Sequence, residues 1–299
     1  MDINFELYKI FYHVAKYKSF SDAAAKLHVS QSAISQAVKN LEYKTGSQLF
    51  YRKTREVKLT SEGEILFKHI EQAYNFIKTA ENKLLELQNP ESGEIKIGVS
   101  DTICKYYLID PIDKFMQKHP KVKIQVINRT SHQILNILKE GKIDFGIVTL
   151  PVHSKGIAVK NYISVEDIFV ASNKFIELSS RPVSLQELSS YPLLMLDKNS
   201  STRQNTDSFF QKRHLNLVPE IELESIDLLL EFAKIGMGIA HVLKESALPF
   251  INRGELFEIK LKERLPVRRL GIATMKNVPL SRTSSEFIMF LEEKGNNNQ

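Results

Sequence analysis

The sequence predicts an all-α, winged helix-turn-helix domain that continues into a long helix, followed by an α/β domain of two lobes. Three observations predict this fold class. Apolar residues recur at helical spacing over residues 7–41 and again over residues 66–87. Strand-like runs alternate with helical runs from residue 95 onward. Between these regions, Pro90 and Gly93 interrupt the helical pattern and permit a hinge.

Length and composition bound the class of protein. A chain of 299 residues suits about two or three domains, and 42% hydrophobic with 25% charged residues is typical of a soluble globular protein. The sequence lacks both a long uncharged apolar run and an apolar signal core. One cysteine, Cys104, excludes an internal disulfide and a cysteine-based zinc site. We therefore expect a cytoplasmic protein without a membrane partner, a metal or a cofactor.

Positive charge is concentrated at the N-terminus. Residues 1–60 carry ten Lys and Arg against five Asp and Glu, so that +5 of the net charge of +6 lies there. Basic side chains displace the counterions that condense on phosphates, which favours a polyanionic partner for this segment. An ordinary solvated basic surface is the alternative.

The first two helices are predicted from spacing and caps. Leu7, Ile10, Phe11 and Val14 lie on one side of a helix over about residues 5–17. Ser21 is a suitable N-cap for an alanine-rich helix over residues 22–27. A tight turn follows this second helix.

A third helix, capped by Ser30, turns an apolar stripe that includes Ile34, Val38 and Leu41 inward. The side chains on its other side are short, polar or basic: Ser32, Ser35, Gln36, Lys39 and Tyr43. Such side chains reach base edges and phosphates when a recognition helix lies in the major groove. A plain three-helix bundle would show the same periodicity.

Two short strands around a basic turn are expected after Gly46. Arg52, Lys53 and Arg55 lie in this turn, where we expect them to contact the DNA backbone without reading its sequence. A hairpin with merely solvated charges is the alternative.

A long helix is expected after the wing, with a capping box formed by Ser61 and Glu64. Its apolar residues alternate steps of four and three and make a heptad seam: Leu66, Ile70, Ala73, Ile77, Ala80, Leu84 and Leu87. The seam predicts dimerisation through this helix. A monomer could instead fold the stripe onto its own body.

The remaining residues have a βαβ rhythm, which indicates a parallel sheet covered by helices. The expected strands are residues 95–99, 122–127, 143–148, 167–171, 193–196, 220–224, 238–242 and 270–274. The rhythm pauses near Tyr162, so we expect two lobes.

Ligands of open α/β sheets lie beyond the carboxyl ends of the strands, where helix N-termini offer free amides. Hydroxyl side chains follow the expected strands at these ends. The candidate effector-binding residues are Ser100, Thr102, Thr130, Ser131, Thr149, Ser200, Ser201, Thr202 and Arg203. Arg203 is the first candidate to meet an acidic ligand, with Arg129 and Lys105 as weaker ones. Helix caps and a structural ion pair are the alternatives.

Catalysis is not expected. The sequence has no His-x-x-x-His, Gly-x-Ser-x-Gly, Walker or dinucleotide-binding glycine pattern. The Gly236-Met237-Gly238 run leads into a strand rather than away from one, so it cannot form a phosphate-binding turn. We expect a protein that is not an enzyme.

The N-terminal pattern resembles the signature of the LysR family of transcriptional regulators. The matching residues are Ser19-Phe20-Ser21, Ala23-Ala24, Leu27, Val29 to Ser35, Leu41-Glu42, Gly46, Leu49-Phe50, Arg52, Leu59-Thr60 and Gly63. The resemblance implies that Gln31, Ser32, Ser35 and Gln36 read bases and that Arg52 contacts phosphate. It further implies a C-terminal effector domain like a type 2 periplasmic binding protein, which holds a ligand between two lobes.

By this resemblance we place the DNA-binding domain at residues 1–60, the dimerisation helix at 61–88, a hinge at 89–93 and the effector domain at 94–299. Lobe I would comprise residues 94–162 and 266–299, and lobe II residues 163–265. Many family members carry Gly-Ser-Gly-Thr-Arg at the second lobe's helix, where this chain has Asn199 and Ser201 in place of the glycines.

The sequence therefore predicts a regulator that binds an interrupted inverted repeat in double-stranded promoter DNA and responds to a small effector, for which an anion is one candidate. The expected partner is a second copy of the chain, in a homodimer or homotetramer, and RNA polymerase is a further candidate. An architectural DNA-binding protein whose C-terminal domain only oligomerises is the alternative.

Overall fold

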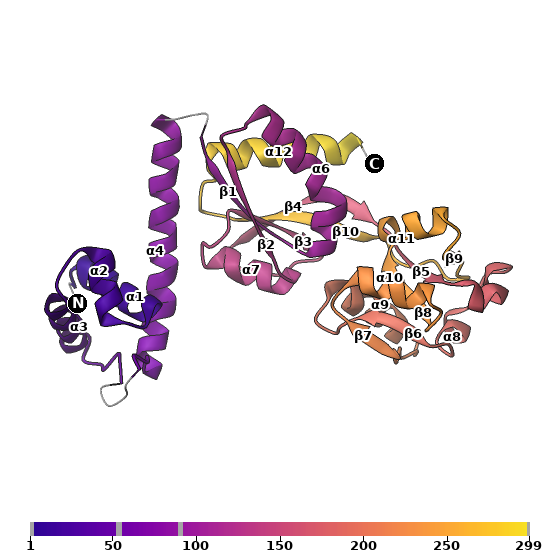
Figure 1. Ribbon diagram of the computed structural model, residues 1–299, viewed down its shortest axis with the longest axis horizontal. Helices are drawn as coiled ribbons and strands as arrows, with labels where there is room; N and C mark the ends of the chain where they lie inside the picture. The colour runs from indigo at the N-terminus through magenta and orange to yellow at the C-terminus, as the bar shows by residue number, and fades with distance from the viewer. Residues whose placement is uncertain (1–2, 52–55, 89–91, 298–299) are drawn as a thin grey trace. The chain divides into compact units, whose positions relative to one another are not determined.

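The computed structural model describes residues 3–51, 56–88 and 92–297 (Figure 1). The chain divides into two compact units, residues 1–85 and 86–299, and each is described by itself.

The first unit is helical. Its helices are α1 (Phe5–Tyr17), α2 (Phe20–Leu27), α3 (Gln31–Thr45) and the greater part of α4 (Ser61–Gln88). Phe11 and Val14 of α1 and Ile34 and Leu41 of α3 are fully buried in the core between them. The predicted apolar stripes of the first and third helices are thus confirmed.

Two of the expected helix caps were wrong by one or two residues. The second helix is capped by Ser19 rather than Ser21: the Asp22 N–H donates to the Ser19 hydroxyl at 3.1 Å. The helix starts earlier because Phe20 packs its ring on Phe50 and so belongs to the first turn. Likewise Thr60, and not Ser61, caps α4, since its hydroxyl accepts from the Gly63 N–H at 3.0 Å.

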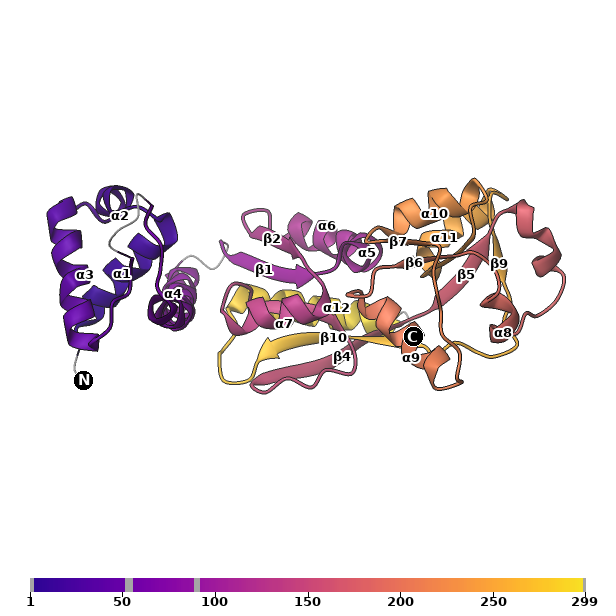
Figure 2. The same ribbon diagram turned by 90° about the horizontal axis from the view of Figure 1, so that it is seen from below.

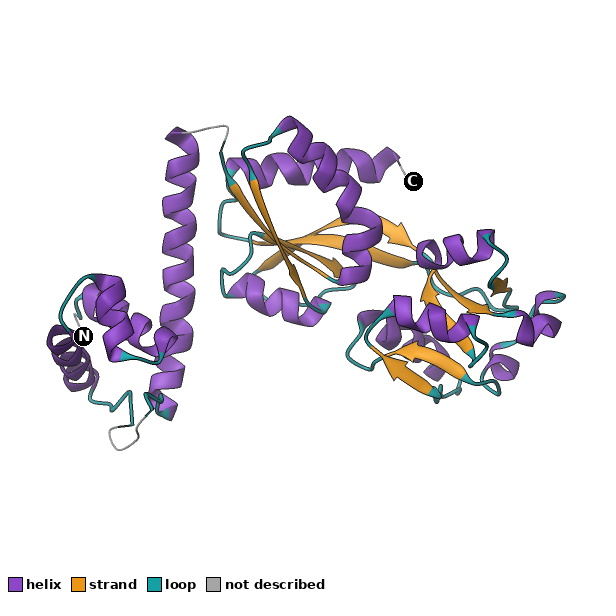
Figure 3. Cartoon of the chain, in the orientation of Figure 1, coloured by secondary structure: helices purple, strands orange, loops and turns teal. Residues whose placement is uncertain are grey.

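The second unit contains two five-stranded sheets, each covered by helices on both faces (Figure 3). The first sheet has the order β2-β1-β3-β10-β4. Its strands are β1 (Glu94–Val99), β2 (Lys123–Asn128), β3 (Phe145–Thr149), β4 (Ile157–Val165) and β10 (Arg268–Met275). Strand β1 pairs in parallel with β2 and β3, whereas β10 is antiparallel to β3 and β4.

Helices α6 (Ile109–Lys118) and α12 (Arg282–Asn297) cover one face of the first sheet, and α7 (Ser131–Lys139) covers the other (Figure 1). Phe115 and Phe287 meet edge to face on the first side, with ring centroids 4.8 Å apart. Ile134 and Leu138 of α7 are buried in a separate cluster on the second side. Strands buried on both faces are expected for a parallel sheet.

The second sheet has the order β7-β6-β8-β5-β9. Its strands are β5 (Asp167–Ala171), β6 (Leu193–Leu196), β7 (Ile221–Leu223), β8 (Ile239–Leu243) and β9 (Phe257–Ile259). Side chains alternate between the two faces, so that Leu194 and Leu196 lie in one apolar cluster while Leu193 and Met195 lie in another.

Helices α10 (Ile226–Lys234) and α11 (Lys244–Asn252) contribute to the first of these clusters. The helices α8 (Leu185–Leu188), α9 (Ser201–Gln211) and η2 (Asn173–Ser179) contribute to the second. Two short segments, α5 (Asp101–Ile103) and η1 (Cys104–Leu108), connect β1 to α6. Figure 2 shows the succession of elements along the unit from a second direction.

The chain passes between the sheets at two places. Strand β4 ends at Val165 and β5 begins at Asp167, and β10 begins at Arg268 after β9 ends at Ile259. Strand β4 of the first sheet therefore extends three residues beyond the lobe boundary expected at 162, because β10 pairs with β4 as far as Val165.

Glu42 links the end of α3 to the base of the wing. Its carboxylate accepts from the Leu49 N–H at 2.8 Å and from the Phe50 N–H at 3.3 Å, and the side chain is buried. Between α3 and these two residues the chain turns at Gly46, whose φ of 67° is the left-handed conformation that glycine adopts at low cost. Phe50 then pairs with Leu59 across the wing.

Replacing Glu42 by alanine should destabilise the first unit by about 2–4 kcal/mol, because two buried N–H groups lose their acceptor. Hydrogen exchange of unit 1 peptides in the full chain measures this loss. The matched control is Glu62→Ala at an exposed position of α4, expected to cost less than about 1 kcal/mol. Equal protection in the two variants would contradict the assigned role of Glu42.

Candidate functional site

Helix α3 presents a polar and basic face to solvent. Of the predicted base-reading residues, Gln31, Ser32 and Gln36 are exposed and Ser35 is half-buried, and the predicted DNA contact Lys39 is also exposed. The Ser30 hydroxyl caps the helix by accepting from the Ala33 N–H at 3.2 Å. The buried stripe fixes the rotation of the helix, and the cap fixes where it begins.

The exposed face includes Tyr43, as expected, and two residues that were not expected, Asn40 and Lys44. Tyr43 is 87% exposed, and Asn40 and Lys44 lie beside it on the same helix. Neither Lys39 nor Lys44 forms an ion pair with any residue that the structure describes. Both cations are thus available to a polyanion. Three of the predicted phosphate contacts, Arg52, Lys53 and Arg55, lie outside the described residues.

The predicted seam of α4 divides into two halves. Leu66 and Ile70 pack against the core of the first unit, which is the arrangement expected if the stripe folds onto the chain's own body. Further along, Ile77, Leu84 and Leu87 are 40%, 62% and 73% exposed. Ala73 is half-buried and Ala80 exposed. Only the second half of the seam is therefore free to contact another molecule.

A cleft of about 810 Å³ lies between the two sheets of the second unit. Eight of the nine predicted effector residues line it: Ser100, Thr102, Thr130, Ser131, Thr149, Ser200, Ser201 and Thr202. Because the strands of each sheet end at this cleft, residues from distant parts of the chain meet there. Its volume suits a small organic molecule.

Two helix N-termini open onto the cleft. At α9 the N-cap residue Ser200 makes no side-chain hydrogen bond to its helix, so the first amides of α9 keep their donors. At α7 the Thr130 N–H donates to the Gln133 side chain at 3.2 Å, and the Ser131 hydroxyl accepts from the Thr149 N–H at 3.1 Å. The first amides of α9 can therefore donate to an anion in the cleft.

The structure does not place Arg203 in the cleft. Its side chain is 2% exposed, and it pairs with Asp207 at 2.8 Å and with Glu222 at 3.5 Å. It also donates to the Leu196 carbonyl oxygen at 3.0 Å. Arg203 therefore anchors α9 to β6 and does not line the cleft, because its side chain points back toward the sheet.

The weaker cationic candidates differ from each other. Arg129 lines the cleft and donates to the Asn128 carbonyl oxygen at 2.7 Å. Lys105 instead pairs with Asp227 at 2.8 Å.

Arg268 is a cleft residue that the sequence did not indicate. Its guanidinium pairs bidentately with Asp167, both bonds being 2.8 Å, and donates to the Thr149 hydroxyl at 3.4 Å. Asp167 is the first residue of β5 and Arg268 the first residue of β10, the two strands that follow the passages of the chain between the sheets. Nothing in the local pattern marks Arg268 as a cleft residue, since its position depends on the pairing of β10 with β3 and β4.

His241 on β8 is buried, and its imidazole lies 3.2 Å from the Thr206 hydroxyl. Burial lowers the pKa of His241 to about 4, so the ring is neutral at physiological pH. Among the residues described here, no group of three His, Cys, Asp or Glu side chains could hold a metal ion. In the same residues no helix is long and apolar enough to span a membrane.

Family models match almost the whole chain. Residues 5–64 match the bacterial regulatory helix-turn-helix protein, lysR family, and residues 88–296 match the LysR substrate binding domain. A probable RuBisCO transcriptional regulator of Cyanidium caldarium is 29% identical over 83% of this chain and 82% of its own length. The HTH-type transcriptional regulator YofA of Bacillus velezensis is 27% identical over 93% of both chains.

Solved structures share the fold. A full-length OxyR variant from Pseudomonas aeruginosa has a TM-score of 0.71 at 19% identity and covers 98% of this chain and 94% of its own. Full-length CbnR, solved with its target DNA, has a TM-score of 0.68 at 16% identity over 97% and 99% of the two chains. With both family models matched in the expected order, this chain belongs to the LysR family of transcriptional regulators.

Proposed function

We infer that α3 reads the sequence of an interrupted inverted repeat in promoter DNA, and that a small molecule in the cleft regulates this binding. The observation that carries the proposal is the exposed polar and basic face of α3, with Gln31, Ser32, Gln36 and Lys39. Amide side chains such as Gln36 can form bidentate hydrogen bonds with adenine in the major groove. Lysines along the helix neutralise phosphates and add affinity without sequence preference.

Two copies of the chain would place two α3 helices on successive half-sites of the DNA. The surface for this pairing is the exposed half of the α4 seam, where Ile77, Leu84 and Leu87 would be buried by the partner. We extend the proposal to a tetramer of two such dimers and to contact with RNA polymerase at the promoter.

The effector would bind in the cleft between the sheets. Free amides at the N-terminus of α9 and the hydroxyls of Thr102, Thr130 and Thr149 favour a ligand rich in hydrogen-bond acceptors. Because both sheets contribute residues, a bound ligand would favour one angle between them. Different affinities of the two conformations for ligand would then shift the equilibrium of DNA binding.

Gln36→Ala should weaken binding to the promoter DNA beside the protein's own gene by about 1–3 kcal/mol, because a direct base contact is lost. Fluorescence anisotropy with labelled duplex measures the dissociation constant. Gln88→Ala, which removes an exposed amide at the end of α4, is the control and should leave affinity unchanged. Specific binding that is the same in both variants would count against reading by α3.

The double variant Leu84→Glu/Leu87→Glu should weaken self-association by at least about tenfold, since four charges would be buried in the paired seam. Analytical ultracentrifugation gives the association constant. Ile65→Glu is the control, because Ile65 is 64% exposed on α4 but outside the seam. If Ile65→Glu lowered the association constant as much as the double variant, pairing along the seam would be refuted.

A cleft ligand present at 100 times its dissociation constant should stabilise the protein by about 2.7 kcal/mol. We expect a thermal-shift screen of small acids, amino acids and phosphates to find such a compound, and Thr102→Val/Ser200→Ala to weaken its effect. Ser164→Ala, at an exposed hydroxyl away from the cleft, is the control. Stabilisation that survives loss of the cleft hydroxyls would place the ligand elsewhere.

A further inference from the structure

A second cavity of about 470 Å³ lies between the two sheets, apart from the cleft described above. It is formed by β4, by α9 and by the first residues of β10. Its polar lining consists of Asn161, Asn205, Ser208, Lys212, Arg268 and Arg269. We call it the hinge groove, because the chain crosses from one sheet to the other along it. Arg268 is the residue that it shares with the cleft.

The hinge groove is lined by three cations and by no carboxylate. Arg268 is neutralised by Asp167, but Lys212 and Arg269 form no ion pair within the part of the chain that the structure describes. Both side chains are exposed. Some other exposed cations of this unit do have such a partner: Lys160 pairs with Glu292 and Arg181 with Glu187. The charge of the groove thus lacks a partner of opposite sign.

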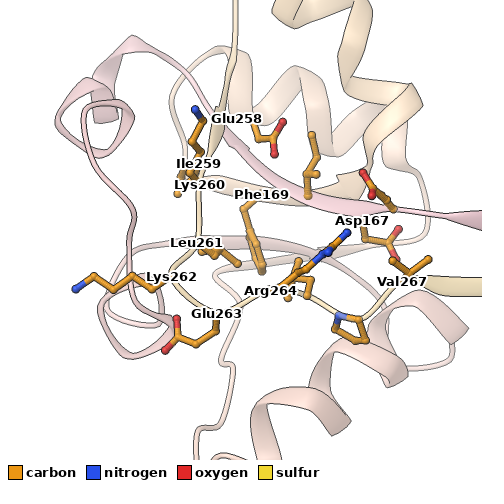
Figure 4. Close-up of a pocket in the computed structure, with 14 residues that line it drawn as sticks. Asp167, Phe169, Glu258, Ile259, Lys260, Leu261, Lys262, Glu263, Arg264 and Val267 are labelled. Atoms are coloured by element: carbon orange, nitrogen blue, oxygen red, sulfur yellow. The ribbon is translucent and has the colours of Figure 1, made fainter.

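A neighbouring pocket of about 370 Å³ shows the contrast (Figure 4). Its basic side chains Lys260, Lys262 and Arg264 share one segment of the chain with Glu258 and Glu263, and Asp167 also lines the pocket (Figure 4). Acidic residues also line the cleft, namely Asp101, Asp197 and Glu224. These two cavities hold charges of both signs, whereas the hinge groove holds one sign.

The neutral polar side chains of the groove are also available. Asn161, Asn205 and Ser208 make no side-chain hydrogen bond to any described residue. Amide and hydroxyl groups can donate to an oxyanion beside Lys212 and Arg269. Next to them, Arg213 lies over the Phe209 ring, 3.8 Å from its centroid, and donates to the Phe209 carbonyl oxygen, which holds this edge of α9 in place.

We propose that the hinge groove is a second ligand site, which binds a small oxyanion carrying two negative charges, either a phosphate ester or a dicarboxylate. Arg269 and Asn161 would bind it from the first sheet, and Lys212 and Asn205 from the second. A charge-assisted hydrogen bond from each side joins the sheets through the ligand. Occupancy of this site therefore also acts on the angle between the lobes.

The experiment titrates the full chain by isothermal calorimetry at constant ionic strength. Inorganic phosphate and glycerol 3-phosphate form one arm, succinate forms the other, and acetate is the singly charged reference. The test variant is Lys212→Gln/Arg269→Gln, which changes two exposed side chains and leaves Arg268 in place. The matched control, Lys262→Gln/Arg264→Gln, removes the same charge from the pocket of Figure 4.

We expect a doubly charged anion of at least one arm to bind the wild type more tightly than acetate does. The groove variant should lose at least about tenfold in affinity, because two charged donors are removed. The control should lose less than about twofold, which is the effect of net charge alone at physiological salt. The arm that binds identifies the source of the oxyanion.

Equal losses in the two variants would overturn the proposal, as would the absence of binding in both arms up to about 10 mM. DNA binding of the groove variant, measured alongside, should equal that of the wild type without ligand. This second measurement separates a failure of the groove from a failure of the regulatory function.

Discussion

The second unit depends on one buried ion pair at the place where its two sheets are joined. Asp167 and Arg268 are 8% and 5% exposed and lie on the two strands that leave the crossings. Removing water from two charges is costly, and good geometry with further hydrogen bonds is needed to offset the loss. Here the bidentate contact and the Thr149 hydroxyl supply that geometry. The pair holds the first residues of β5 and β10 together where the chain passes between the sheets. Arg268 lines both the cleft and the hinge groove.

Most of the fold could be predicted from periodicity. Residues 167–171 and 193–196 were expected as strands and are β5 and β6, because continuous apolar runs such as Leu193 to Leu196 are buried on both faces. Strands β4 and β9 were not expected. In β4 the exposed Lys160 and Asn161 interrupt the apolar pattern, and the strand is held by its pairing with β10. Pairing between strands that lie this far apart in the chain leaves no local pattern in the sequence.

The candidate site was predictable to a similar extent. Hydroxyls after strands could be placed, since the topology of an α/β sheet brings strand ends together. The roles of the two arginines could not. Arg203 follows a strand end as an effector ligand would, yet its side chain turns back to Asp207 one helical turn later. Arg268 has no such signal, because the antiparallel return of β10 alone brings it beside Thr149.

The attachment of α4 to the first unit has a mechanical consequence. Leu66 and Ile70 belong to the same core as α1 and α3, so the beginning of α4 and α3 move as one body. A helix of 28 residues is about 42 Å long. A change of only five degrees in the angle at which two such helices cross would thus displace their far ends by about 4 Å, roughly one base-pair step of DNA. In the proposed dimer, small rearrangements near the end of α4 would in this way become a change of register on the double helix.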